Sequence, residues 1–425
     1  MSSTQFRLPV LLLNWPWTRR LSPHYEQAKR DSSAWVESFK PFGAKGQRAF
    51  NACDLNLLAS LAYSARDDPD FIRLGCDLMN FYFVYDEYTD IATPEEAGRL
   101  ASTVITAMKT PSESEDQHLL VEMTRQFWQR ALTLAEPGST CLEHFITTSE
   151  LYLHAVTQEA EDRQQNRVRT IADYLPLRRE TCGARPSLAL YEFGLGLPEE
   201  VTSHPIFEAL AQDAIDLIIF INDMHSYVRE ISCGLANHNI ITLIMHEYGL
   251  GLQEALDWLG TRTEEVIQRF LHNARNVPSW GEEIDSKVQV YIDSLGQWVR
   301  GSDDWSCEAK RYHGNDGLRI QDTRLITICP RKANYVKEDE AGNEVAEEKA
   351  HLEGKSKAPG TSGEAKGGSV TQQSCSNWVV SEKYQIPTHV PAAAVDWFTD
   401  KVKFWWKSFS VSLRKFFHGP RPLRT

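Results

Sequence analysis

Residues 218–230 read IIFINDMHSYVRE, and they are the most informative part of the chain. Asn222, Ser226 and Glu230 recur at every fourth position, so on an α-helix they form one stripe of side chains at intervals of roughly 6 Å. The stripe offers an amide oxygen, a hydroxyl and a carboxylate, which suit Mg²⁺ or Mn²⁺ and suit Zn²⁺ poorly. The alternative is an ordinary polar helix face, but the preceding residues 214–221 are almost all apolar. The stretch therefore predicts a metal site on a buried helix.

A second acidic stretch, residues 80–90, reads NFYFVYDEYTD. It also begins with apolar and aromatic residues and then places Asp86 and Asp90 one helical turn apart, with Glu87 beside them. Like charges at this spacing destabilise an isolated helix, and a multivalent cation reverses the sign of that interaction. We therefore expect Asp86 and Asp90 to be metal ligands at the mouth of an apolar pocket.

The motifs DEYTD and NDMHSYVRE together resemble the two metal motifs of class I terpene synthases, an aspartate-rich D-(D/E)-x-x-D box and an N-D-x-x-S-x-x-x-E triad. Their order and separation are also similar to that family. The resemblance implies an all-α, class I terpenoid synthase-like helical bundle with a central active-site cavity. It further implies a prenyl diphosphate substrate and three Mg²⁺ ions, with Mn²⁺ as a substitute, held by Asp86, Asp90, Asn222, Ser226 and Glu230.

Residues 177–183, LRRETCG, resemble the segment with which this family senses diphosphate. In that segment an arginine lies four residues before a glycine that breaks the helix facing the substrate. The match implies Arg179 as the sensing arginine, Cys182 as the linker position and Gly183 as the residue whose carbonyl acts on the substrate.

Residues 305–312, WSCEAKRY, resemble the W…RY segment of the same family. This match implies that Arg311 and Tyr312 reach the diphosphate.

The opening residues 8–23 are similar to fungal, basidiomycete-type sesquiterpene synthases in particular. In these enzymes an N-terminal strap helps to close the active site, so the similarity implies a sealing role for Arg19 or Arg20. The resemblance covers roughly residues 8–332, and the last part of the chain has no counterpart in it.

The chemistry of such a site follows from its charges. Carboxylates repel a diphosphate until divalent cations bridge the two, and arginines complete the clamp because a guanidinium donates paired hydrogen bonds to phosphate oxygens. Ionisation of the allylic carbon–oxygen bond then leaves a carbocation, which requires a dry, aromatic wall. Phe83 lies one turn before Asp86, so it is expected to line this wall; a plain core role is the alternative.

Composition agrees with one large helical domain. The chain has 425 residues, of which 42% are hydrophobic, and its net charge of −13 argues against nucleic-acid binding. The eight cysteines show no C-x-x-C spacing, which indicates reduced thiols in the cytosol. The apolar residues 10–13 are too few to span a membrane. Apolar side chains at three- and four-residue spacing predict helices over 97–109, 116–134, 142–163, 205–231, 252–275 and 280–299.

Three segments are expected along the chain. Residues 1–332 form the synthase domain, and residues 333–390 form a disordered linker that is rich in charged and small residues. Residues 391–425 form a basic, aromatic, amphipathic helix. This tail is expected either to contact a membrane surface or a partner, or to fold back on its own domain.

The predicted function is the Mg²⁺-dependent cyclisation of farnesyl diphosphate to a sesquiterpene hydrocarbon, by a cytoplasmic enzyme with peripheral membrane contact. Among the fungal enzymes, the DEYTD variant is similar to those that make humulyl-derived skeletons such as protoilludene. One alternative is a prenyl-chain elongating synthase, which normally carries two aspartate-rich boxes. The other is a non-catalytic helical scaffold that the tail recruits to membranes.

Overall fold

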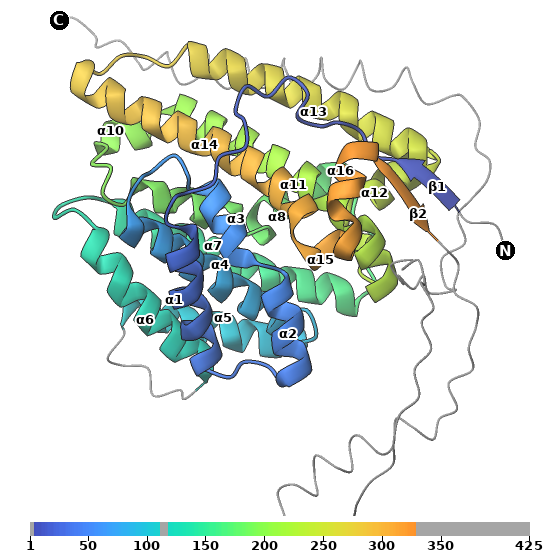
Figure 1. Cartoon of the computed structure of the whole chain (residues 1–425), viewed down its shortest axis with the longest axis horizontal. Coiled ribbons are helices and arrows are strands. Elements are labelled where there is room, and N and C mark those ends of the chain that lie inside the picture. The colour runs from blue at the N-terminus through green and yellow to red at the C-terminus, as the bar shows by residue number, and fades with distance from the viewer. Residues whose placement is uncertain (1–3, 111–117, 329–425) are drawn as a thin grey trace, which may run out of the picture.

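The computed structural model describes residues 4–110 and 118–328, and within these the chain is helical almost throughout (Figure 1). The predicted all-α class is confirmed. Residues 329–425 lie outside the described residues, so the predicted linker, the amphipathic tail and the segment boundaries stay predictions. No helix among the described residues is long and apolar enough to cross a membrane.

The helices follow the chain in the order α1 (Tyr25–Ser38), α2 (Ala44–Ala52), α3 (Leu55–Ala62), α4 (Pro69–Thr89), α5 (Pro94–Lys109), α6 (Leu119–Leu134), α7 (Cys141–Gln164), α8 (Ile171–Thr181), α9 (Ala184–Ala189), α10 (Glu199–Thr202), α11 (Pro205–Cys233), α12 (Ile240–Tyr248), α13 (Leu252–Arg275), α14 (Glu282–Glu308), α15 (Lys310–His313) and α16 (Gly317–Thr323). Short 3-10 turns are η1 (Leu190–Glu192), η2 (Ala236–His238) and η3 (Gly314–Asp316). Strand β1 (Thr4–Arg7) pairs antiparallel with β2 (Leu325–Ile328).

Helices α4 and α11 carry the two acidic motifs, and the sequence explains where each helix begins. The Asp68 carboxylate accepts hydrogen bonds from the first backbone N–H groups of α4, and proline occupies the first position of both helices. Helix α11 ends at Gly234, whose φ of 78° is left-handed and favours glycine. Both helices are buried over most of their length, α11 against α13 and α14 and α4 against α3 and α1. The motifs therefore end long core helices, as their apolar runs predicted.

The segment between β1 and α1 crosses the outside of α13 and α14 as a strap (Figure 1). Two tryptophans anchor it: the Trp15 indole N–H donates to the Gly296 carbonyl at 3.0 Å, and the Trp17 carbonyl accepts from Arg300 at 2.8 Å. A Cβ atom at Gly296 would lie 2.2 Å from the Trp17 ring, so only glycine allows the strap to lie this close. The predicted strap is confirmed as a packed element.

Candidate active site

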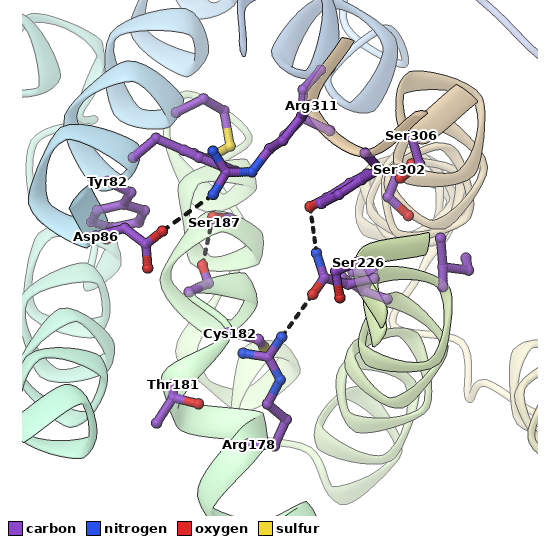
Figure 2. Close-up of a pocket in the computed structure, with 18 of the residues that line it drawn as sticks. Tyr82, Asp86, Arg178, Thr181, Cys182, Ser187, Ser226, Ser302, Ser306 and Arg311 are labelled. Atoms are coloured by element: carbon purple, nitrogen blue, oxygen red, sulfur yellow. Dashed lines mark hydrogen bonds and ion pairs between the residues drawn. The ribbon is translucent and has the colours of Figure 1, made fainter. Parts of the chain in front are cut away.

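One cavity opens between the ends of α4, α7, α8, α11, α14 and α15, with about 1160 Å³ of atom-free space including the part open to solvent (Figure 2). Its walls bring together almost all of the predicted site residues, namely Phe83, Asp86, Asp90, Gly183, Asn222, Ser226, Glu230, Arg311 and Tyr312. Arg179 is the exception and is absent from the lining.

The α4 wall is rich in negative charge and loosely held. Asp86 leaves 42% of its side chain exposed, and its Oδ2 lies 3.4 Å from Arg311 Nη2. Burial, together with the neighbouring Asp86 and Glu159 carboxylates, raises the pKa of Asp90 to about 8. Burial also raises the pKa of Asp86, although Arg311 opposes the shift. Glu159 comes from α7, and local sequence spacing did not reveal it.

The α11 wall is held by hydrogen bonds to neighbouring side chains. Asn222 Oδ1 accepts a hydrogen bond from Arg178 Nη2 at 2.7 Å, and Asn222 Nδ2 donates to the Tyr312 hydroxyl at 2.8 Å. Ser226 is only 2% exposed. Burial, followed by the nearby Asp223 carboxylate, raises the pKa of Glu230 to about 7. This wall thus presents its three oxygen donors in fixed positions.

The donor set fits a hard divalent cation. Asp86 and Ser226 lie on opposite walls of the same cavity (Figure 2), and every predicted ligand atom is an oxygen. Within the described ranges, no three His, Cys, Asp or Glu side chains are grouped to hold a metal by themselves. The site therefore depends on Asn222 and on Ser226 as well as on carboxylates. Arg311 Nε is buried without a hydrogen-bond partner among the described residues, which leaves a donor for an anion.

The structure places Arg178, and not Arg179, on the cavity wall. Arg179 turns away and pairs with Asp216, at 2.7 Å from Nε to Oδ1 and 3.0 Å from Nη2 to Oδ2. The reason is helical geometry: α8 ends before Gly183, which has a left-handed φ of 66°. Arg179, four residues before Gly183, lies on the face of α8 that is directed toward Asp216, and its sensing role stays a prediction. Arg178 and Cys182, four residues apart, both face the cavity.

Gly183 itself lies where the sequence predicted, at the break between α8 and α9. Its carbonyl accepts a hydrogen bond from the Ser187 hydroxyl at 2.7 Å. Both residues line the cavity.

The short helix α15 brings Arg311 and Tyr312 into the cavity. The Arg311 guanidinium lies 4.6 Å from the centre of the Phe83 ring, and Trp305 meets Phe83 and Tyr312 edge-on at 5.9 and 5.5 Å. Arg311 is 7% exposed and pairs with both Asp86 and Glu87. Phe83 is therefore part of the cavity wall and also a support for the arginine.

Two further basic residues bear on the site. Arg229, one residue before Glu230, lines the cavity with its Nη2 3.9 Å from Glu87. Its position inside the NDMHSYVRE motif was a signal that the sequence analysis did not use. Arg19, predicted to help seal the site, pairs with Glu308 at the end of α14, just before the helix that carries Arg311. Arg20 does not line the cavity.

Comparisons with known proteins agree with this geometry. Residues 77–269 match the family described as "Terpene synthase family 2, C-terminal metal binding". The chain is 60% identical over 344 residues to sesquiterpene synthase Agr8 of Cyclocybe aegerita, covering 80% of this chain and 96% of that protein. It is 41% identical over 331 residues to the Delta(6)-protoilludene synthase of Armillaria gallica, covering 77% and 95% of the two chains.

Among solved structures, germacradien-4-ol synthase from Streptomyces citricolor matches with a TM-score of 0.61 and 22% identity, over 69% of this chain and 97% of that one. At this identity the match supports the fold alone. The two walls of oxygen donors, the three cavity arginines and the 60% identical relative lead to one assignment. The chain belongs to the class I terpene synthases, within their fungal sesquiterpene synthase branch.

Proposed function

We propose that this protein ionises farnesyl diphosphate and cyclises it to a sesquiterpene hydrocarbon, with release of diphosphate. One observation carries the proposal. Two walls of one aromatic-lined cavity each present oxygen atoms that suit a hard metal ion, and Arg178 and Arg311 lie on opposite walls. Relatives named Delta(6)-protoilludene synthase support a humulyl-derived product formed by 1,11-cyclisation.

Asp86 and Asp90 on one wall, and Asn222, Ser226 and Glu230 on the other, would hold the divalent cations. The matched family segment is described as metal-binding, which supports a divalent metal. Three Mg²⁺ ions, with Mn²⁺ as a substitute, are our proposal for the full complement. When bound, the cations neutralise the diphosphate and make it a better leaving group.

Two arginines of the cavity pair with side chains that are proposed metal ligands. Arg178 donates to Asn222 Oδ1, and Arg311 pairs with Asp86. If these two oxygens bound cations, each guanidinium group would lose that contact and could donate to phosphate oxygens instead. Tyr312 and Arg229 line the same space and add donors there. This exchange links closure of the site to the arrival of the diphosphate.

The remaining wall suits a carbocation. Tyr82, Phe83, Tyr152, Trp298 and Trp305 line the cavity and present aromatic surface, which stabilises positive charge and supplies no strong nucleophile. Gly183 contributes a backbone carbonyl dipole on the α8 side.

The deciding experiment incubates the purified protein with Mg²⁺ and farnesyl diphosphate and analyses the headspace by gas chromatography with mass spectrometry. We expect a cyclic C15 hydrocarbon. Addition of isopentenyl diphosphate tests the elongation alternative, because an elongating synthase would release a longer prenyl diphosphate. A protein that released neither product would be a scaffold, and the proposal would be wrong.

We also propose that residues 1–332 act as the catalytic domain of a cytoplasmic enzyme. Residues 333–390 link this domain to the basic tail 391–425, and the tail contacts a membrane surface. Every proposed site residue lies at or before Tyr312. Basic residues contribute roughly 1 kcal/mol each near an anionic surface. A chain that ends after Lys332 should keep its turnover and lose co-sedimentation with anionic vesicles. Equal sedimentation of both chains would remove the membrane role, and lost turnover would show that the tail supports the domain.

A further inference from the structure

Asn239, the residue before α12, is fully buried and does not line the cavity, so it cannot touch a substrate. Its Oδ1 accepts a hydrogen bond from the Ile241 backbone N–H at 2.9 Å, which caps the first turn of α12. This bond also fixes the orientation of the amide, because turning it over would place N–H against N–H. The amide nitrogen therefore faces α11.

The Nδ2 group of Asn239 reaches the ligand-bearing turns of α11. It donates to the Asp223 carbonyl at 2.7 Å and to Glu230 Oε2 at 2.9 Å, and it lies 3.5 Å from Ser226 Oγ. The two hydrogens of the amide account for the two short bonds. One side chain thus contacts two of the three proposed metal ligands on this wall, and also the helix backbone beside them.

We propose that Asn239 is a positioning residue for the metal site, which holds Glu230 and Ser226 in the orientation that ligates the cation. The bond to Oε2 fixes the orientation of the Glu230 carboxylate, which lines the cavity. Groups that hold ligands in this way are typically worth about 10- to 100-fold in metal affinity or activity. The inference rests on the proposed function of α11 as a metal-binding wall.

A purely structural role for Asn239 would be the cap of α12, and this role can be separated from positioning. Serine and aspartate both cap helices, so Asn239→Ser and Asn239→Asp retain an acceptor for the Ile241 N–H. Neither variant has an amide N–H to donate to Glu230. In addition, Asp223 Oδ2 accepts from the Ile240 N–H at 2.9 Å, so the start of α12 keeps a second attachment to α11.

The chain offers a matched control in Asn80 on α4. Asn80 is buried as well, and its Nδ2 lies within hydrogen-bond distance of Ser32 Oγ at 2.9 Å, Asn56 Oδ1 at 2.8 Å and the Cys76 carbonyl at 3.1 Å. None of these groups is a proposed ligand or lines the cavity. Asn80→Ser therefore removes a comparable buried amide without touching the metal site.

The experiment titrates Mn²⁺ into full-length protein with inorganic diphosphate and follows both the melting temperature and the free Mn²⁺ signal in electron paramagnetic resonance. We expect the midpoint of the titration to rise about 10- to 100-fold in both Asn239 variants. In Asn80→Ser the melting temperature without metal should fall while the midpoint stays at the wild-type value. Turnover of Asn239→Ser should recover largely at high Mg²⁺, which a misfolded site would not do.

A wild-type midpoint in either folded Asn239 variant would overturn the proposal. If both variants fail to fold while Asn80→Ser folds, Asn239 serves the fold alone and the proposal is wrong. If the wild-type protein itself binds no Mn²⁺ with diphosphate, the proposed function fails, whatever the variants do.

Discussion

The two walls of the cavity differ in how completely the protein builds them before any ligand arrives. On α11, Asn222 and Glu230 are held by neighbouring side chains, with hydrogen bonds of 2.7 to 2.9 Å. On α4, Asp86 has one longer contact with Arg311, and within the described part of the chain the Asp90 carboxylate makes no hydrogen bond or ion pair. The α11 wall is therefore preorganised, whereas the Asp86 and Asp90 carboxylates of α4 have few partners in the metal-free protein.

The largest effect is expected from removing one ligand from each wall. Asp86→Asn and Asn222→Ala should each reduce turnover by at least about 100-fold, because electrostatic groups of this kind are worth roughly 3 to 4 kcal/mol. The melting temperature should separate the walls. Asn222→Ala removes one hydrogen-bond partner each from Arg178 and Tyr312 and should lower it, whereas Asp86→Asn removes repulsion and should not. Steady-state kinetics and thermal melts check both; full activity in either variant would contradict the metal assignment.

The next effect tests which arginine senses the diphosphate. Arg178→Lys keeps the charge but loses the planar fork, so ionisation should slow about 10- to 100-fold, equivalent to roughly 1.5 to 3 kcal/mol for bonds to a charged group. Arg179→Lys should stay within about twofold, because its partner Asp216 also lies 3.7 Å from Arg269. Single-turnover rates with farnesyl diphosphate make the comparison. A slower Arg179→Lys enzyme would return the sensing role to Arg179.

The same two arginines show what sequence could and could not predict. The stripes on α4 and α11 depend on spacing within one helix, so the residues alone could predict which side chains share the cavity as candidate ligands. The choice between Arg178 and Arg179 depends on where α8 ends, and a shift of one residue changes the face. Glu159 and Asn239 reach the site from other helices, and only tertiary packing brings them there.

A third prediction concerns pH. The pKa values of Asp90, about 8, and Glu230, about 7, are above those of the unfolded chain. The folded, metal-free protein therefore holds more protons than the unfolded chain, and these groups lower its stability as pH rises from about 4 to 8. Cation binding needs the charged carboxylates, so the affinity for Mg²⁺ with diphosphate should rise at least about tenfold between about pH 6 and 8.

Thermal melts with and without Mg²⁺ and diphosphate, at several pH values, measure this difference. The gain in melting temperature should increase across the window and level off above it. In Asp90→Asn, the part of the pH-dependent gain in melting temperature that is due to Asp90 should disappear, and the part due to Glu230 should remain. A gain that does not change with pH would show that both carboxylates are already charged in the metal-free protein.

Among the residues that line the cavity, the smallest change in rate is expected from Phe83→Leu, which alters the aromatic wall. Loss of the ring removes its contact with the Arg311 guanidinium at 4.6 Å, worth roughly 0.5 to 2 kcal/mol, so turnover should fall only about fivefold. The product mixture should change more, because the ring and Trp305 shape the space in which the carbocation folds. Phe81→Leu is the matched control: Phe81 lies on the same helix, is buried against Phe127 and does not line the cavity. Gas chromatography with mass spectrometry of both variants decides the point. Identical profiles for wild type and Phe83→Leu would place Phe83 among the supports of Arg311 and not among the residues that guide cyclisation.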